Sequence, residues 1–334
     1  MTNRERVLRA ITFDRPDVPP CQCSLTGQMR DKLFAYPGGK ECYEKFGSPT
    51  ASVDLIPPQT PVKFEYDRDW FGVVWNKTGA DKDIGVIDNL MIPDPEDFEN
   101  YVFPPVPEEW IRKNCAWLET QKKDKFTVAS LGFSLFERAW TLCGMENLLC
   151  YMIVEPEFAH ALLERITDFN LKCLDIALEY DFDAVYFGDD WGQQHGMIMG
   201  PEHWREFIKP CLEKMYGRVK KAGRYVVQHS CGDNQEVLED LMELGLDVYQ
   251  TFQPEIYDLR HYQKVFKGRL SIWGGISTQA ELPSKTPEEI KALTTERLEL
   301  FREGGLIAGP THAVPGDVPP ENLIAMLEAM MDFR

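Results

Sequence analysis

Two histidines and one cysteine have the residue types and the spacing that could bind a transition metal. His229 and Cys231 lie two positions apart at the end of the segment RYVVQHSC, and His312 follows the apolar segment GLIAGP. Residues i and i+2 of an extended chain point to the same side, so the imidazole and the thiolate could share one ion. One thiolate with two imidazoles suits Zn²⁺, and three protein ligands with an open fourth position are typical of a catalytic zinc site. The alternative is that Cys231 is an inert core residue, because H-x-C is a short pattern.

A pair of acids, Asp189 and Asp190, directly follows the apolar segment DAVYFG. Two adjacent carboxylates at the end of a buried strand can raise the pKa of one of them or bind a cation. The alternative is a helix N-cap beside one solvated acid. Glu137 and Trp140 are three residues apart and would share one face of a helix, where packing and hydrogen bonding are the simpler roles.

Polar or glycine-rich ends follow five apolar segments of the chain at the same relative place. These ends are Asp189, Asp190 and Trp191; Gln228, His229 and Cys231; Gln250 and Gln253; Trp273, Gly274 and Gly275; and Thr311 and His312. If the five segments are parallel strands of a barrel, their ends converge at one rim, where catalytic loops lie.

The elements that would position these residues form a regular alternation from about residue 125 onward. The expected strands are KFTVASLG, DAVYFGDD, RYVVQHS, DVYQTF, RLSIWGG and GLIAGP, and a segment with helical periodicity follows each of them. Repeated strand–helix units predict parallel strands with right-handed crossovers. We expect a (β/α)8 TIM barrel rather than a doubly wound open sheet, because the units continue to the C-terminus without a Gly-rich dinucleotide fingerprint.

The first 124 residues are irregular and rich in proline and aromatic residues. In this part PPCQCSL is a candidate first strand, DWFGVVWNK alternates like a hairpin strand, and DPEDFENYVFPPVPEEW is typical of a loop and short helix. We therefore expect one domain over residues 1–334, with an irregular N-terminal part and regular units over 125–334.

The overall charge excludes some classes of partner. The chain has 36 basic and 54 acidic residues, a net charge of −18, which disfavours nucleic-acid binding. Neither a signal-peptide h-region nor an apolar run long enough to span a membrane is visible in the sequence. The nine cysteines are scattered and odd in number, so reduced thiols in a cytoplasmic protein are expected.

Several segments together resemble the uroporphyrinogen decarboxylase superfamily. They are FERAWTLCGMENLL, FGDDWGQQ, GPEHWREFIKP, QHSCGD, SIWGGISTQ and GPTHAVPGDVPPENL, with a looser match in RERVLRAITFDRPDVPP. The resemblance covers about residues 125–334 strongly. It implies a TIM barrel with its active site at the C-terminal ends of the strands.

Two branches of that superfamily lead to different expectations. The metal-free decarboxylases resemble one another in an N-terminal R-Q-A-G-R segment that grips substrate carboxylates, whereas this chain has PPCQCSLTGQMR there, with Arg30 just beyond. The cobalamin-dependent methyltransferases resemble this chain in the H-x-C pair and in a third zinc ligand after the last strand. That ligand is Cys in the coenzyme M enzymes and His312 here, which argues against coenzyme M as the substrate.

The exchange of a cysteine for His312 has a chemical consequence. Zinc with one thiolate and two imidazoles has a core charge of +1, against zero with two thiolates and one imidazole, and so is the stronger Lewis acid. Thiol activation would still work, but the more electrophilic metal also suits polarising an ether oxygen. With the corrinoid chemistry that the resemblance implies, we therefore expect transfer of a methyl group between a small substrate, for which a methoxylated aromatic compound is a candidate, and a corrinoid carried on a partner protein, an O-demethylation. The corrinoid protein would dock transiently at the open mouth of the barrel.

The remaining candidate residues receive roles from this interpretation. Asp189 or Asp190 would orient the substrate or ligate the ion, and Gln228 and Gln253 would bind the substrate or support the ligands. Phe133, Trp191 and Trp273, with Glu137, would contact the substrate, the three aromatic side chains forming a wall or simply belonging to the core. Two alternatives stay open: a uroporphyrinogen decarboxylase or related metal-free lyase, and a non-catalytic barrel subunit.

Overall fold

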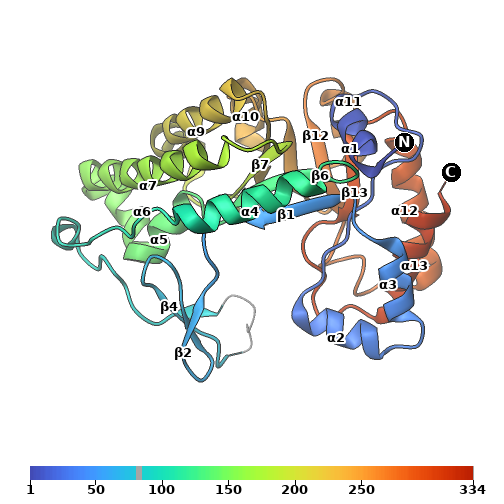
Figure 1. Ribbon diagram of the computed structural model, residues 1–334, viewed down its shortest axis with the longest axis horizontal. Coiled ribbons are helices and arrows are strands. Elements are labelled where there is room, and N and C mark those ends of the chain that lie inside the picture. The colour runs from blue at the N-terminus through green and yellow to red at the C-terminus, as the bar shows by residue number, and fades with distance from the viewer. Residues whose placement is uncertain (80–84, 334) are drawn as a thin grey trace.

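A curled sheet of parallel strands forms the centre of the computed structural model, which describes residues 1–79 and 85–333 (Figure 1). Its strands, in spatial order, are β1 (Thr50–Asp54), β6 (Phe126–Leu131), β7 (Ala184–Gly188), β10 (Tyr225–His229), β11 (Val248–Phe252), β12 (Ser271–Ile276) and β13 (Leu306–Pro310). Every neighbouring pair is parallel. Most of these strands are apolar runs because helices cover one face and the curled interior covers the other. The predicted parallel α/β architecture is confirmed as a seven-stranded half-barrel.

The N-terminal segment continues the sheet beside β13 without forming a regular strand. Cys21 is bridged to Ala308 and Leu25 to Val314, both in the parallel sense. Their backbone bonds include Gln22 N–H to Ala308 O at 2.8 Å. The segment PPCQCSL thus lies where an eighth strand would be expected, and the closed eight-stranded barrel stays a prediction.

The inner face of the curled sheet is filled by its own side chains and by the first helix. Val128, Ala184, Val227 and Ile307 project inward from four strands and are at most 3% exposed. Helix α1 (Asn3–Ile11) contributes apolar side chains to the same cluster. Because this end of the sheet is packed, ligand-binding residues are left to the C-terminal ends of the strands.

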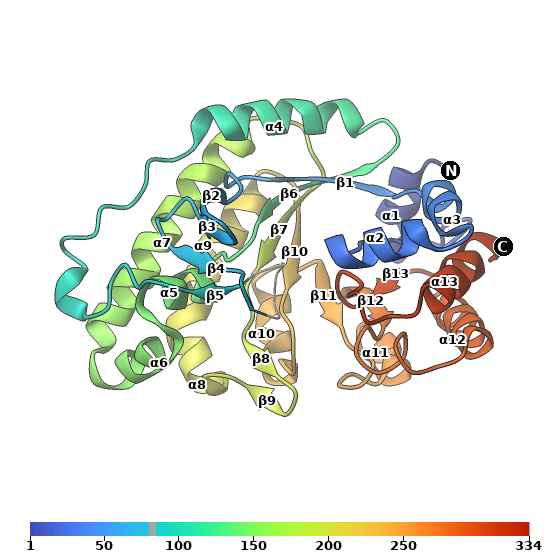
Figure 2. The same cartoon turned by 90° about the horizontal axis from the view of Figure 1, so that it is seen from below.

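Helices cover the outer face of the sheet (Figure 2). The long ones are α4 (Glu108–Gln121), α7 (Pro156–Ala177), α9 (Lys209–Lys221), α12 (Pro287–Leu300) and α13 (Pro320–Asp332). The shorter elements are α2 (Gly27–Ala35), α3 (Gly39–Phe46), η1 (Pro95–Asp97), α5 (Phe136–Cys143), α6 (Met145–Val154), α8 (Gly200–His203), η2 (Trp204–Ile208, π-helical), η3 (Gln235–Val237), α10 (Leu238–Glu243) and α11 (Leu259–Val265). None of the helices in the described part of the chain combines the length and apolar character that crossing a membrane requires.

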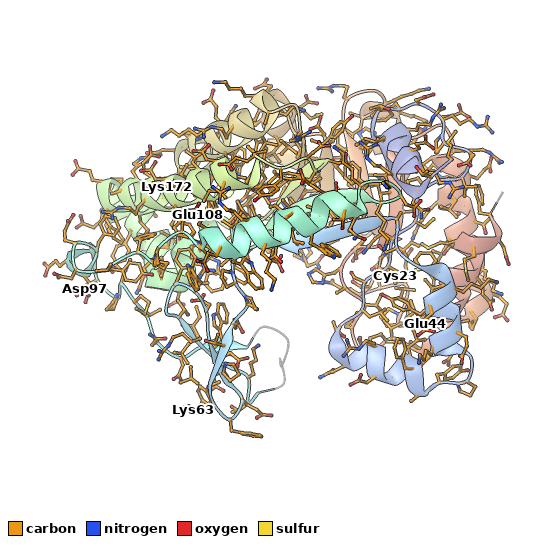
Figure 3. All side chains as sticks on the ribbon, in the orientation of Figure 1. Cys23, Glu44, Lys63, Asp97, Glu108 and Lys172 are labelled. Atoms are coloured by element: carbon orange, nitrogen blue, oxygen red, sulfur yellow. The ribbon has the colours of Figure 1, made fainter. Side chains whose placement is uncertain are left out.

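The region expected to be irregular contains a second, antiparallel sheet. Its strands are β2 (Thr60–Lys63), β3 (Tyr66–Arg68), β4 (Val74–Asn76) and β5 (Val86–Ile87). The predicted hairpin strand in DWFGVVWNK is β4, which pairs with β3. Figure 1 shows this small sheet projecting below α4 and α5, and Figure 3 shows Lys63 at its outer end. A buried ion pair at 2.6 Å, from Arg138 of α5 to Asp69, ties it to the body.

A candidate metal site at the ends of β10 and β13

The structure brings His229, Cys231 and His312 together. His229 is the last residue of β10, Cys231 follows two residues later, and His312 lies two residues beyond the end of β13. One possible ligand atom from each residue lies within 4.8 Å of those of the other two. Nε2 of His229 is 3.7 Å from Sγ of Cys231, and the centroids of the two imidazole rings are 5.5 Å apart. His229 and Cys231 are half-buried and His312 is exposed, so the group faces the mouth of the sheet.

Side chains of the neighbouring strands orient the imidazole ring of His229 through hydrogen bonds. Gln250 of β11 is the register partner of His229, and its Oε1 meets Nδ1 of the imidazole. The same oxygen accepts a hydrogen bond from the Tyr186 hydroxyl at 3.0 Å, and Nε2 of Gln250 donates to the carbonyl of Thr311. An acceptor at Nδ1 selects the tautomer that carries its proton there, which leaves Nε2 free to bind a metal.

The loop after β10 fixes Cys231 through its backbone. The Cys231 N–H donates to Oδ1 of Asp190 at 2.8 Å, and this oxygen also lies 3.4 Å from Nε2 of His229. Asn234 donates to the Cys231 carbonyl at 3.0 Å. Burial, and then the nearby Asp190 carboxylate, raises the pKa of the Cys231 thiol well above its usual range. Cys231 would therefore ionise when it coordinates a cation, because a metal ion deprotonates a coordinating thiol.

Two glycines let this loop approach the hairpin of β8 (Gly192–Gln193) and β9 (Gly196–Met197). Gly232 has φ of 78°, and a Cβ there would lie 2.3 Å from the Gly192 carbonyl carbon. A Cβ on Gly192 would in turn lie 2.7 Å from the Cys231 carbonyl oxygen. Neither position accepts a side chain unless the loop that carries Cys231 moves.

The two adjacent acids have different surroundings. Asp189 is fully buried and accepts hydrogen bonds from the backbone N–H groups of Leu135, Phe136 and Glu137 at 2.8 to 3.2 Å, and from the indole of Trp191 at 2.6 Å. It therefore caps the N-terminus of α5. Burial raises the pKa of Asp189 to about 7, against the lowering effect of those hydrogen bonds. Asp190, in contrast, faces His229 and Cys231.

Glu137 is half-buried in the first turn of α5. Burial, followed by the carboxylates of Asp190 and Asp189, raises its pKa well above the usual range, and a hydrogen bond from the Asp190 backbone opposes this. Glu137 and Asp190 thus form an acidic pair beside the candidate metal ligands.

The two glutamines predicted to act at the site occupy different places. Gln228 is fully buried on the opposite face of β10 from His229, where its Oε1 accepts from the Tyr216 hydroxyl at 2.5 Å and its Nε2 donates to the His229 carbonyl at 2.7 Å. Gln253 is 4% exposed, and its Oε1 accepts from the Gly232 N–H at 2.8 Å. Gln253 thus holds the loop that carries Cys231, whereas Gln228 joins β10 to α9.

Among the described residues, no ring contact joins the three aromatic residues predicted to form a wall. Phe133 is half-buried and contacts the rings of Trp75 and Trp140, with centroids 5.6 and 6.3 Å away. Trp191 is fully buried, edge-on to Trp204. Trp273 is 8% exposed and packs in the inner cluster with α1. Of the three side chains, that of Phe133 is the least buried.

Two residues of the site were not assigned a role from the sequence. Gln250 stands out only as a polar residue near the end of DVYQTF, and Tyr186 only as a polar ring within DAVYFG. Strand register places these two residues near His229. The register can be derived only after the order of the strands in the sheet is known.

Comparisons with known proteins give a family and a fold. A family model described as uroporphyrinogen decarboxylase (URO-D) matches residues 78–333. A methylated-thiol–coenzyme M methyltransferase of Methanosarcina mazei is 25% identical over 194 residues, covering 58% of this chain and 50% of the relative. A uroporphyrinogen decarboxylase of Chlorobaculum parvum is 27% identical over 257 residues, covering 72% and 67%. The aligned part of this chain thus spans half to about two thirds of these relatives' lengths.

One solved structure is similar over the full length of the chain. A methyltransferase from Methanosarcina mazei superposes with a TM-score of 0.72 at 18% sequence identity, covering 99% of each chain. At that identity the likeness establishes a shared fold.

Proposed function

Because this chain belongs to the uroporphyrinogen decarboxylase family, we propose that it is a zinc-dependent methyltransferase that moves a methyl group between a small substrate and a corrinoid carried by a partner protein. The observation that carries the proposal is the grouping of His229, Cys231 and His312 at the C-terminal ends of β10 and β13. Sequence similarity to a methyltransferase supports the same class of reaction, and the fold is one that a methyltransferase structure shares.

The geometry of the three residues fits zinc. Zinc–sulfur and zinc–nitrogen bonds of about 2.3 and 2.0 Å at a tetrahedral angle place sulfur and nitrogen about 3.5 Å apart. The distance from Sγ of Cys231 to Nε2 of His229 is 3.7 Å. Gln250 supplies the outer hydrogen bond that metal-bound histidines usually make. The pair His229 and Cys231 thus needs only a small adjustment to share one ion, and the ligand atom of His312 lies within 4.8 Å of theirs. A fourth position would be left for substrate.

Zinc in this site would supply Lewis-acid polarisation of the oxygen or sulfur atom that the methyl group leaves or joins. The side chains of this protein have supporting roles: Gln250 orients His229, while Asp190 and Gln253 orient the loop of Cys231. In the demethylation direction the methyl carbon–oxygen bond would break and leave its electron pair on the oxygen. The reduced corrinoid of the partner protein, acting as a co-substrate, would supply the electron pair of the new bond to the methyl carbon.

The partner would approach from the open end of the sheet. In this proposal the segment through Cys21 and Leu25 completes a (β/α)8 barrel as its eighth strand, and the ligands face the mouth. The corrinoid protein has to leave after each transfer, so its docking would be transient.

A decarboxylase function is the second candidate because some relatives carry that name. Binding a polycarboxylate would require cationic side chains at the mouth. Within residues 1–79 and 85–333, the hydrogen bonds and ion pairs of His229, Cys231 and Asp190 involve no Lys or Arg side chain. The surroundings of the site therefore favour the methyltransferase.

The test is methyl transfer with purified components. Zinc-loaded protein is mixed with reduced corrinoid protein and a panel of methyl ethers and thioethers, and the corrinoid absorbance spectrum reports methylation. We expect turnover of at least one donor, its loss in Cys231→Ser, and its retention in Cys150→Ser, which changes an exposed cysteine outside the site. Decarboxylation of a porphyrinogen without any methyl transfer would contradict the proposal.

A further inference from the structure

Asp190 lies beside two of the three candidate ligands. Its Oδ1 is 3.4 Å from Nε2 of His229 and accepts a hydrogen bond from the Cys231 N–H at 2.8 Å. Two atoms bound to one zinc ion through bonds of about 2.0 Å lie about 3.3 Å apart at the tetrahedral angle. The separation between the Asp190 oxygen and the His229 nitrogen is therefore about that of two atoms that share an ion.

The hydrogen bonds of Gln250 decide which atoms of this group are acceptors. Nε2 of Gln250 donates to the Thr311 carbonyl, so Oε1 is the atom that meets Nδ1 of His229. Nδ1 then carries the proton of a neutral imidazole, and Nε2 has a free lone pair. This lone pair faces the Asp190 oxygen, and the two repel each other unless a cation or a second ring proton lies between them. Sγ of Cys231, 3.7 Å from the same Nε2, adds a third electron-pair donor, which favours the cation.

The side chain of Asp190 is less confined than that of its neighbour in the chain. It is 34% exposed, whereas Asp189 is fully buried and bonded to the first backbone N–H groups of α5. The group of ligand atoms that all lie within 4.8 Å of one another consists of the two histidines and the cysteine, without Asp190. Asp190 thus reaches the ligands that follow β10 but stands outside the compact group of three.

From this position we infer that Asp190 is an exchangeable fourth ligand, which binds the zinc ion through Oδ1 when no substrate is present and is displaced by the ether oxygen or thioether sulfur of the substrate. The bond from the Asp190 oxygen breaks as the bond to the substrate atom forms, and neither a proton nor an electron is transferred. The displaced carboxylate keeps the Cys231 N–H as its hydrogen-bond partner. The identity of the metal and of the displacing atom rests on the proposed function.

The exchange would tie the reactivity of the site to the arrival of substrate. With Asp190 bound, two imidazoles, one thiolate and one carboxylate bring the charge of the zinc site to zero. A neutral substrate atom in place of the carboxylate returns this charge to +1, which makes the metal the stronger Lewis acid. The site is therefore most electrophilic only after the substrate has bound.

Asp190→Asn separates the role of a ligand from the support of the loop. Asparagine keeps an oxygen that accepts from the Cys231 N–H, but it loses the negative charge with which a carboxylate binds zinc. Asp233→Asn is the matched control, because it makes the same change in the same loop and the Asp233 carboxylate accepts from Gln235. Urea unfolding should give both variants the stability of the parent.

Two binding measurements on each protein, made without corrinoid, test the exchange. Competition with a chromophoric chelator gives the zinc dissociation constant. The increase in thiolate-to-cobalt absorption of the cobalt(II)-substituted protein reports binding of 2-mercaptoethanol. We expect Asp190→Asn to bind zinc at least about tenfold more weakly. We expect the same variant to bind the thiol several-fold more tightly, because the thiol no longer competes with a carboxylate, and Asp233→Asn to behave like the parent.

The opposite directions of the two shifts distinguish a ligand from a structural residue. A purely structural role of Asp190 would weaken the binding of both zinc and thiol. Thiol binding that is weaker or unchanged in Asp190→Asn, or zinc affinity equal to that of the parent, overturns the inference. Opposite shifts without methyl transfer to any corrinoid would refute the proposed function and leave the role of Asp190 standing. A parent that takes up neither metal would overturn both.

Discussion

Gln250 and His229 lie opposite each other on the neighbouring strands β11 and β10, and Oε1 of Gln250 meets Nδ1 of the imidazole. This pairing turns Nε2 toward Sγ of Cys231. Gln250 in turn forms hydrogen bonds with the Tyr186 hydroxyl on β7 and with the Thr311 carbonyl just after β13. The orientation of the His229 ring therefore depends on β7, on β11 and on the end of β13. The orientation of a candidate ligand thus depends on a residue that is not itself one of the candidate ligands.

Replacing Gln250 by leucine should weaken zinc binding. The variant removes the acceptor at Nδ1, and loss of such an outer partner typically lowers metal affinity about 10- to 100-fold. Competition with a chromophoric chelator measures the zinc dissociation constant. Zinc affinity equal to that of the parent would show that Gln250 does not orient His229.

Gln228→Leu is the matched control, because Gln228 precedes His229 on β10 and points to the other face. We expect zinc affinity to be retained while the free energy of unfolding falls by about 1 to 3 kcal/mol, since the hydroxyl of Tyr216 loses its buried acceptor. Urea unfolding measures this change. A loss of zinc without a loss of stability would reverse the roles assigned to the two glutamines.

Asp189→Asn should reveal the raised pKa of the carboxyl group that caps α5. Burial raises this pKa to about 7, so between pH 4 and pH 7 the folded state holds a proton that the unfolded chain has released. The free energy of unfolding of the parent then falls as pH rises, and the asparagine variant lacks this contribution. The parent's advantage over Asp189→Asn should shrink by about 2 to 3 kcal/mol from pH 5 to pH 8 in urea unfolding. An advantage that grows with pH would mean that Asp189 is ionised in the fold.

Gly232→Ala should disturb the metal site more than an alanine at another left-handed glycine. Its Cβ would clash with the backbone of Gly192 and displace the loop that carries Cys231. Gly223, with φ of 71° and open space around it, is the control, since alanine there adds only the backbone strain of about 1 to 2 kcal/mol. Gly232→Ala should lose both additional stability and zinc affinity. Identical behaviour of the two variants would contradict the close packing of this loop against β8.

The sequence was informative about the regular part of the fold because strand and helix periodicities alternate there. All six strands expected after residue 125 are present. The strand β1, TASVD, is short and half polar, so no periodicity marks it, and its place beside β6 comes from pairing alone. PPCQCSL has strand-like composition, yet it makes isolated bridges to the chain around β13.

The sequence predicts the part of the site that depends on how side chains alternate between the two faces of one strand. The rule that places His229 and Cys231 on one side also places Gln228 on the other, so the sequence already contained the argument against Gln228. The difference between Asp189 and Asp190 was not predictable, because it depends on where α5 begins in space. The burial of Trp191 likewise depends on its contact with Trp204, which no local pattern shows.

The central claim is that His229, Cys231 and His312 hold one zinc ion, and elemental analysis of protein purified without chelator and without a polyhistidine tag tests it most directly. The account predicts about one zinc per chain in the parent and in Cys150→Ser, and almost none in a folded Cys231→Ser variant. A parent that carries no metal and takes up none when zinc is offered, or a Cys231→Ser variant that keeps a full equivalent, would contradict it.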